Sequence, residues 1–111
     1  ALLPGGTDAF KKYIGEFEVR SLEMKTNSEQ LRREAEKMGE YFYGGFVGMP
    51  EGQGQLLEAR AAHLHYSKKN SLLATSDDLM QGAKEIDIFV SFLREFEQMN
   101  RGKLDSSPSR A

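Results

Sequence analysis

Two histidines, His63 and His65, are the side chains best suited to metal binding or proton transfer near neutral pH. A spacing of two residues places them about 200° apart around a helix, so they cannot reach one metal ion from the same face. We interpret both as surface or rim residues and assign no metal ligand. With Lys68 and Lys69 they form a candidate cationic patch, which would steer docking onto an acidic partner.

Glycines at positions 44, 45, 48, 52 and 54 raise the question of a phosphate-binding loop. Such a loop needs a Lys-Ser/Thr pair at the start of the following helix and a strand before the loop. Neither is present, so we interpret residues 46–54 as a flexible or tightly turned connector.

Closely spaced carboxylates are the remaining candidates for catalysis: Glu34 and Glu36, Asp77 and Asp78, and Glu95 and Glu97. General acid–base catalysis needs a carboxylate whose pKa is shifted by burial in a cleft. These pairs are predicted on solvated faces or at a helix start. No serine lies in a G-x-S-x-G turn. We therefore assign no catalytic or cofactor-binding residue and predict that the protein is not an enzyme.

An aromatic cluster, Tyr41, Phe42, Tyr43 and Phe46, lies at the predicted end of a helix. One interpretation is core packing. The other is an exposed anchor for a partner, since aromatic side chains dominate such anchors. Tyr41, Tyr43 and Phe46 are therefore candidate docking residues, beside the cationic patch.

Composition narrows the class of protein. The 111 residues suffice for one domain, and 39% apolar with 29% charged residues favours narrow apolar stripes on helices. A net charge of −2 is unlike the basic excess of nucleic-acid binders. The absence of cysteine excludes disulfides and thiol chemistry. No apolar run approaches the ~18 residues that a membrane span requires. The first residue, Ala1, is explained by processing of a precursor or by trimmed numbering.

Four amphipathic helices would position these residues. Thr7 and Asp8 can cap the first helix, and residues 26–29 match a capping box that begins the second, which Gly44 and Gly45 end. The third runs from about residue 55 to 74. Thr75 and Ser76 cap the fourth, which Gly102 ends. The predicted inward residues are Phe10, Tyr13, Ile14, Phe17, Leu31, Ala35, Met38, Phe42, Leu57, Ala61, Leu64, Leu72, Leu79, Ala83, Ile86, Phe89, Val90, Leu93 and Phe96.

Short connectors between four such helices predict an all-α, up-and-down four-helix bundle. In this scheme residues 1–6 are a leader, residues 7–104 form a single bundle domain, and residues 105–111 form a polar tail. If the chain stays helical through Thr75, the third and fourth helices fuse and the fold becomes a long helical hairpin.

Residues 48–74, GMPEGQGQLLEARAAHLHYSKKNSLLA, resemble the second-helix region of the PsbQ-type extrinsic proteins of photosystem II. Gly48, Pro50 and Gly54 match that family's turn. The following helix matches at Arg60, Ala61, Leu64, Tyr66 and Lys69. Residues 78–98 resemble the family's next helix in pattern only. Residues 41–43 depart from the family pattern, in which Trp is often found at the end of the second helix; such a departure would fit a divergent, algal-like member.

The resemblance implies a four-helix bundle in the chloroplast thylakoid lumen, peripheral to the membrane and not inserted in it. It implies a non-catalytic extrinsic subunit that docks on the photosystem II core and other extrinsic subunits. Such a subunit helps to retain calcium and chloride at the oxygen-evolving complex without ligating them. No nucleic-acid partner and no cofactor are expected.

Two alternatives remain open. The first is a secreted helical hairpin of the WXG100 type from a type VII secretion system, in which Phe46-Val47-Gly48 would stand for the Trp-x-Gly turn between two helices. The second is a generic helical protein-interaction module. An enzyme is the third and least supported reading, because no polar constellation is clustered in the sequence.

Overall fold

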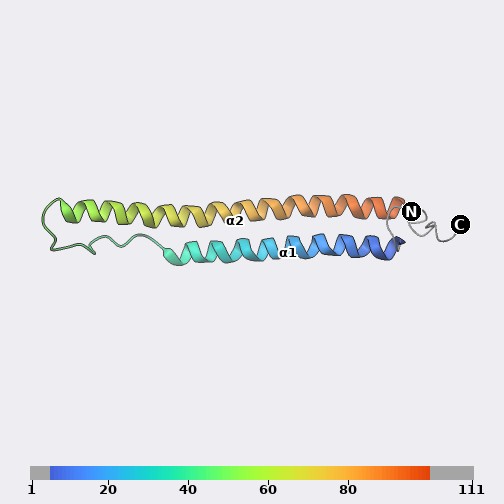
Figure 1. Ribbon diagram of the computed structural model, residues 1–111, viewed down its shortest axis with the longest axis horizontal. Helices are drawn as coiled ribbons and strands as arrows, with labels where there is room; N and C mark the ends of the chain where they lie inside the picture. The colour runs from blue at the N-terminus through green and yellow to red at the C-terminus, as the bar shows by residue number, and fades with distance from the viewer. Residues whose placement is uncertain (1–5, 101–111) are drawn as a thin grey trace. The chain divides into compact units, whose positions relative to one another are not determined.

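The computed structural model describes residues 6–100, and every regular element among them is an α-helix. Helix α1 spans Gly6–Met38 and helix α2 spans Gln53–Met99 (Figure 1). Residues 39–52, here called the connector, join them. The predicted all-α class is confirmed. The predicted four-helix bundle is wrong, because two helices form where four were expected. The predicted tail at 105–111 and all but the last residue of the predicted leader lie outside the described residues.

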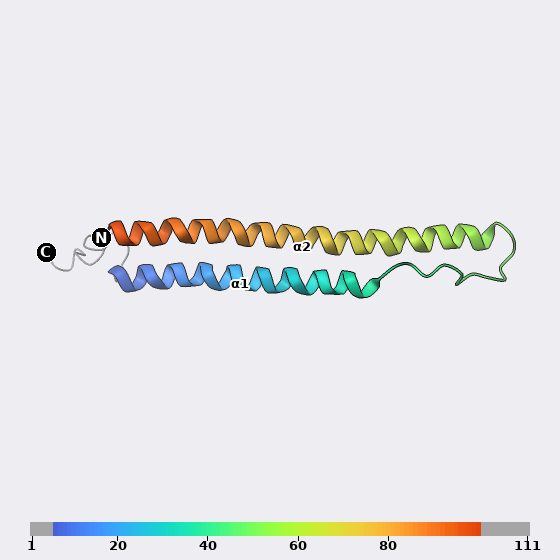
Figure 2. The same ribbon diagram turned by 180° about the vertical axis from the view of Figure 1, so that it is seen from behind.

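The chain divides into two compact units. The terminal unit contains residues 6–26 and 79–100, and the connector unit contains residues 27–78. In each unit a segment of α1 lies beside a segment of α2 that runs in the opposite direction (Figures 1 and 2). The unit boundaries fall close to the two predicted helix breaks, yet both helices continue through them.

Hydroxyl groups that the sequence marks as helix caps make other hydrogen bonds. The Thr26 hydroxyl donates to the carbonyl of Leu22, one turn earlier in the same helix, at 2.9 Å. The Ser76 hydroxyl donates across to the carbonyl of Ser28 at 2.7 Å. Neither hydroxyl is left to cap a new helix, so α1 and α2 stay continuous.

Helix α1 ends earlier than the glycine pair at 44 and 45 would place its end. Gly39 follows Met38 with a positive φ of 59°, the left-handed conformation that commonly terminates helices. The Gly39 N–H still donates to the carbonyl of Glu36 at 3.1 Å. The aromatic residues 41–43 therefore belong to the connector rather than to a helix.

Buried positions recur every seven residues along both helices. They are Ile14, Ser21, Ser28 and Ala35 in α1, and Ala62, Ser76, Ala83, Val90 and Glu97 in α2. Partly buried residues follow three positions later, among them Phe17, Leu31, Leu79, Ile86 and Leu93. Two inward positions in every seven make a narrow stripe, which matches helices that pair along one line of contact. Two helices form instead of four because both continue through the predicted breaks near residues 26 and 75.

Small residues dominate this line of contact and let the paired backbones approach closely. In the terminal unit the Ser21 hydroxyl donates to Asp87 at 2.6 Å and lies 3.3 Å from the carbonyl of Ala83. In the connector unit the Ser28 hydroxyl donates to the carbonyl of Ser76 at 2.6 Å. A serine side chain reaches a carbonyl of the neighbouring helix only when the two helices are close together.

The terminal unit holds the larger apolar core. Phe10, Ile14 and Val90 are buried there, with Phe17, Ile86 and Leu93 packed against them. Ion pairs join Lys25 to Asp87 at 2.6 Å and Glu18 to Arg94 at 2.5 Å. We call these four residues the charged edge of the terminal unit.

Most of the predicted inward residues are buried or half-buried. Five are exposed against prediction: Phe42 at 79%, Leu64 at 69%, Tyr13 and Phe89 at 41%, and Phe96 at 39%. Phe42 is exposed because α1 ends before it, and Leu64 because its position falls off the seven-residue pattern. Among the described residues, neither helix has a segment apolar enough over a sufficient length to cross a membrane.

Candidate docking site at the connector

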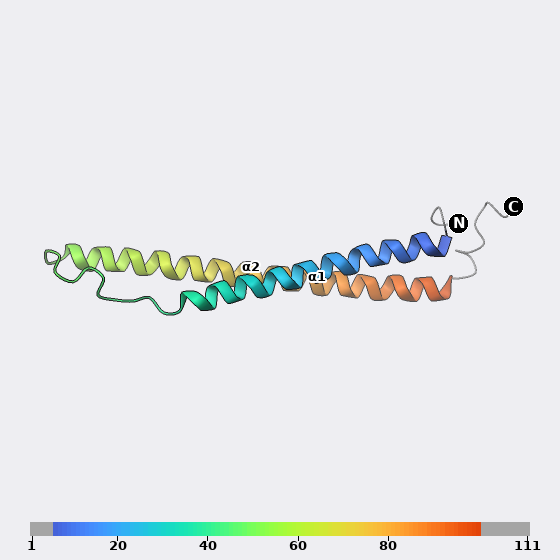
Figure 3. The ribbon, with the colours of Figure 1, turned by 90° about the horizontal axis from the view of Figure 1, so that it is seen from below.

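The connector lies along the first turns of α2 within the connector unit (Figure 3). Helix α2 continues its inward-facing pattern here with Glu58, His65 and Lys69, three polar side chains. Their partner is not a helix but connector backbone, whose N–H and C=O groups need hydrogen bonds. The polar residues at these inward positions supply those bonds.

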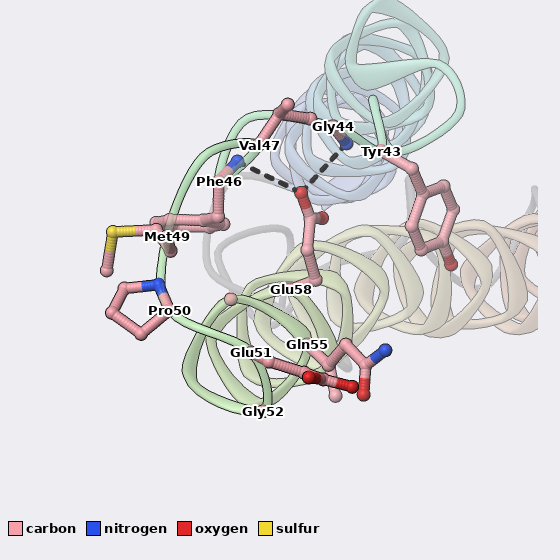
Figure 4. A pocket seen from close by; sticks show the side chains of 12 residues that line it. Tyr43, Gly44, Phe46, Val47, Met49, Pro50, Glu51, Gly52, Gln55 and Glu58 are labelled. Carbon is pink, nitrogen blue, oxygen red and sulfur yellow. Dashed lines mark hydrogen bonds between the residues drawn. The ribbon is translucent and has the colours of Figure 1, made fainter.

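Glu58 organises the middle of the connector. Its Oε1 atom accepts hydrogen bonds from the N–H groups of Gly44 at 2.8 Å and Phe46 at 3.3 Å (Figure 4). Burial by itself would raise the pKa of Glu58, but these bonds and the nearby Tyr41 hydroxyl hold that pKa below its ordinary value. The carboxylate therefore stays charged and holds the turn in one shape.

The second carboxylate oxygen of Glu58, Oε2, is buried and has no hydrogen-bond partner in the described part of the chain. The Tyr41 hydroxyl lies close enough for the two groups to affect each other's titration. Burial, and then the neighbouring Glu58 carboxylate, raise the pKa of Tyr41. Tyr41 therefore acts within the connector as a neutral phenol.

Two cationic candidates hold the end of α1. The carbonyl of Gly39 lies 3.0 Å from His65 Nε2 and accepts a hydrogen bond from Lys69 Nζ at 3.2 Å. A carbonyl can only accept, so the His65 contact requires a proton on Nε2. Tyr66 adds a third link: its hydroxyl donates to Glu40 at 2.7 Å and accepts from the Tyr41 N–H at 3.2 Å.

The seven predicted docking residues thus separate into two groups. His65 and Lys69 are half-buried and bonded to the connector, Tyr41 is half-buried within the connector and packs on His65, and Phe46 is half-buried beside Glu58. His63, Lys68 and Tyr43 are exposed. The structure brings His65 and Lys69 together on one carbonyl and leaves His63 and Lys68 facing solvent.

Exposed apolar side chains are the connector's most unusual feature. Val47 is 85% exposed, Phe42 79%, Tyr43 62% and Met49 43%. We call these four residues the connector surface; Figure 4 shows three of them around the Glu58 side chain. Val47 and Met49 were not predicted as docking residues. The sequence did hold an indication of their exposure: both are apolar residues in a glycine-rich segment that is not expected to be helical.

The glycine-rich sequence has a structural role here. Gly44, Gly48 and Gly52 adopt positive φ angles that other residues rarely take. The N–H groups that converge around Gly44 and Phe46 form a small anion-binding concavity, and the Glu58 carboxylate of the same chain occupies it. Among residues 6–100, no three acidic or histidine side chains are grouped so as to hold a metal ion.

Comparisons of the chain with protein-family models, with curated proteins and with solved structures find no match.

Proposed function

We propose that this chain is a non-catalytic docking module that binds a partner protein through the connector surface. The observation that carries the proposal is the exposure of Phe42, Tyr43, Val47 and Met49 on a segment held by hydrogen bonds. Large apolar side chains that face solvent together are typical of protein-interaction sites.

The hydrogen bonds beneath the connector surface support this proposal. Binding costs less when the contacting segment is already ordered, because little conformational entropy is then lost. Glu58 and Tyr66 from α2 fix the turn, and His65 and Lys69 fix its start at Gly39. The exposed His63 and Lys68 lie on α2 within the same unit and favour a partner that carries acidic groups.

The test is co-purification from the producing cells with the wild-type chain and with a Phe42→Ser, Val47→Ser double variant. Both side chains are exposed, so the variant keeps its fold and its circular dichroism spectrum. We expect the partner to be lost from the variant and kept by a Leu22→Ser control, which removes an apolar side chain that is 65% exposed in the terminal unit. Retention of the partner by the double variant would contradict the proposal.

The class of protein to which this docking module belongs is a separate proposal. The resemblance of residues 48–74 implied both docking on photosystem II and a four-helix bundle. The observed two-helix arrangement removes the support that the fold would have given to this function. A secreted hairpin is favoured by one observation: Phe46-Val47-Gly48 lies between two helices, as that reading requires.

Cell fractionation distinguishes these two interpretations of the chain. Release of the chain from thylakoid membranes by a high-salt wash, with loss and recovery of oxygen evolution, would support the photosystem II proposal. Appearance of the chain in the culture medium would support the secreted hairpin.

A further inference from the structure

The last turns of α2 carry a second row of apolar residues beside the buried one. Phe89, Phe92, Phe96 and Met99 are spaced by three, four and three residues, the spacing of a helix-pairing stripe. They are exposed by 41%, 63%, 39% and 81% respectively. We call these four residues the second stripe. It lies within the terminal unit and has no covering helix among the described residues.

The two edges of the terminal unit differ sharply in chemistry. On the charged edge, Lys25–Asp87 and Glu18–Arg94 ion pairs flank the line of contact, as charged residues usually do in helix pairs. On the opposite edge, aromatic rings instead of ion pairs flank the line of contact between α1 and α2. Phe89 packs edge-on against Phe17 with ring centres 5.2 Å apart.

The aromatic edge continues towards the helix ends. Phe96 lies against Phe10, with ring centres 5.7 Å apart, and Tyr13 packs on Phe17 at 5.0 Å. These contacts fix the inner sides of the rings and leave their outer sides in solvent. Apolar side chains that face solvent together in this way are typical of a surface that binds another apolar surface.

We propose that the second stripe is a self-association surface, on which the α2 helix of a second copy of this chain packs in antiparallel orientation. A two-fold symmetric pair places the same surface on both copies, so the stripe must be complementary to itself. Its uniformly apolar composition meets that condition. Phe92 and Phe96 would lie nearest the two-fold axis.

Charge does not oppose this pairing. Between residues 88 and 99 the charged residues are Arg94, Glu95 and Glu97, and none belongs to the second stripe. Arg94 is bonded to Glu18 on the charged edge, and Glu97 is buried at 7% exposure. Glu95 is exposed three residues after Phe92, so the pairing requires Glu95 of each copy to lie at the rim of the contact, where water solvates its charge.

The available area also suits a second copy. With Ile88 beside it, the second stripe exposes on the order of 500 Å² of apolar surface per copy, taking about 200 Å² for a whole large side chain. A symmetric pair that covered all of this surface would bury roughly 1,000 Å², an area typical of weak, transient interfaces rather than stable ones. This area predicts a dimer that dissociates on dilution rather than a permanent one.

Sedimentation equilibrium across a range of micromolar concentrations tests the proposal. The wild-type chain should move from the 12.5 kDa monomer towards twice that mass as concentration rises. Phe92→Glu should raise the dimer dissociation constant on the order of 100-fold, because the change enters a two-fold interface twice. A wild-type monomer throughout, or an undiminished dimer in Phe92→Glu, would overturn the proposal.

Leu22→Glu is the matched control. Leu22 is 65% exposed against 63% for Phe92, but it lies beside Glu18, Lys25 and Asp87 on the charged edge. We expect this variant to associate like the wild type. Equal weakening by both variants would mean that the second stripe is not the interface.

Disulfide trapping gives a second readout, since the chain contains no cysteine. Under mild oxidation Phe92→Cys should form a covalent dimer far faster than Leu22→Cys. Equal rates would overturn the proposal. These variants leave the connector surface unchanged, so failure of the self-association proposal and failure of docking at the connector are distinguishable.

Discussion

Ser28 and Ser76 bond to each other's helix. The Ser28 hydroxyl donates to the carbonyl of Ser76 at 2.6 Å, and the Ser76 hydroxyl donates to the carbonyl of Ser28 at 2.7 Å. Both residues are almost fully buried, at 2% and 0% exposure. This reciprocal pair holds the α1 and α2 segments of the connector unit at close approach.

Substitution of Ser28 tests this close approach. Ser28→Ala should lower the free energy of unfolding by about 1 kcal/mol, because one buried hydrogen bond is lost. Ser28→Leu should cost about 1–3 kcal/mol more, since a large side chain must be accommodated where the backbones nearly touch. Urea denaturation measures both values. Equal stabilities for the two variants would show that the helices are not closely packed at this position.

Two glycines should respond to alanine with opposite signs. Gly15 lies inside α1 with no atom near an added Cβ, so Gly15→Ala should stabilise by about 0.5–1 kcal/mol through helix propensity. Gly39 has a positive φ, so Gly39→Ala should destabilise by about 1 kcal/mol. Thermal melts of the two variants provide the comparison. A stabilising Gly39→Ala would contradict the position of the α1 terminus.

Glu58 should make the connector sensitive to acid. Its pKa is lowered below the ordinary 4.5 in the folded chain, so its contribution to stability is complete above that value. The contribution is lost as the pH falls through the lowered pKa. An NMR titration of the carboxyl group should place its midpoint below 4.5. Glu58→Gln should flatten the acid-induced change in the connector amide signals; an unchanged titration of those signals would refute this role.

Asp87, in the terminal unit, also has a lowered pKa, but its hydrogen-bond donors are side chains. Hydrogen bonds first from Lys25 and then from Ser21 hold the pKa of Asp87 below its ordinary 3.8. Lys25→Met should move that pKa upward towards its ordinary value. The shift should shrink at high ionic strength, because the pair is partly exposed. A carboxyl NMR titration at low and high salt decides the matter, and no change on Lys25→Met would exclude the pairing.

The sequence predicts the helical class and much of the core, because apolar periodicity is a local signal. Phe10, Ile14 and Val90 were all predicted inward and are buried. The number of helices was mispredicted at Thr26 and Ser76, whose hydroxyls are equally suited to capping and to bonding elsewhere. Only the position of the opposite helix decides between these roles, and that position is not a local property of the sequence.

The connector was harder to predict for a related reason. His65 and Lys69 looked like a surface patch, because cationic side chains are usually solvated. Their role at the Gly39 carbonyl depends on where α1 ends. Phe42 was predicted inward on the assumption that the helix continued through it. An end at Gly39 instead of Gly44 changes the environment of all three residues.

Site-specific photo-crosslinking in the producing cells tests the docking account most directly. A photoreactive residue at position 47, which is 85% exposed on the connector surface, is compared with one at Val19, which is 58% exposed in the terminal unit. The account predicts a saturable crosslink from position 47 to one partner protein. Excess wild-type chain should compete with it, whereas the Phe42→Ser, Val47→Ser variant should not. No saturable crosslink at position 47, or the same product from position 19, would contradict docking through the connector.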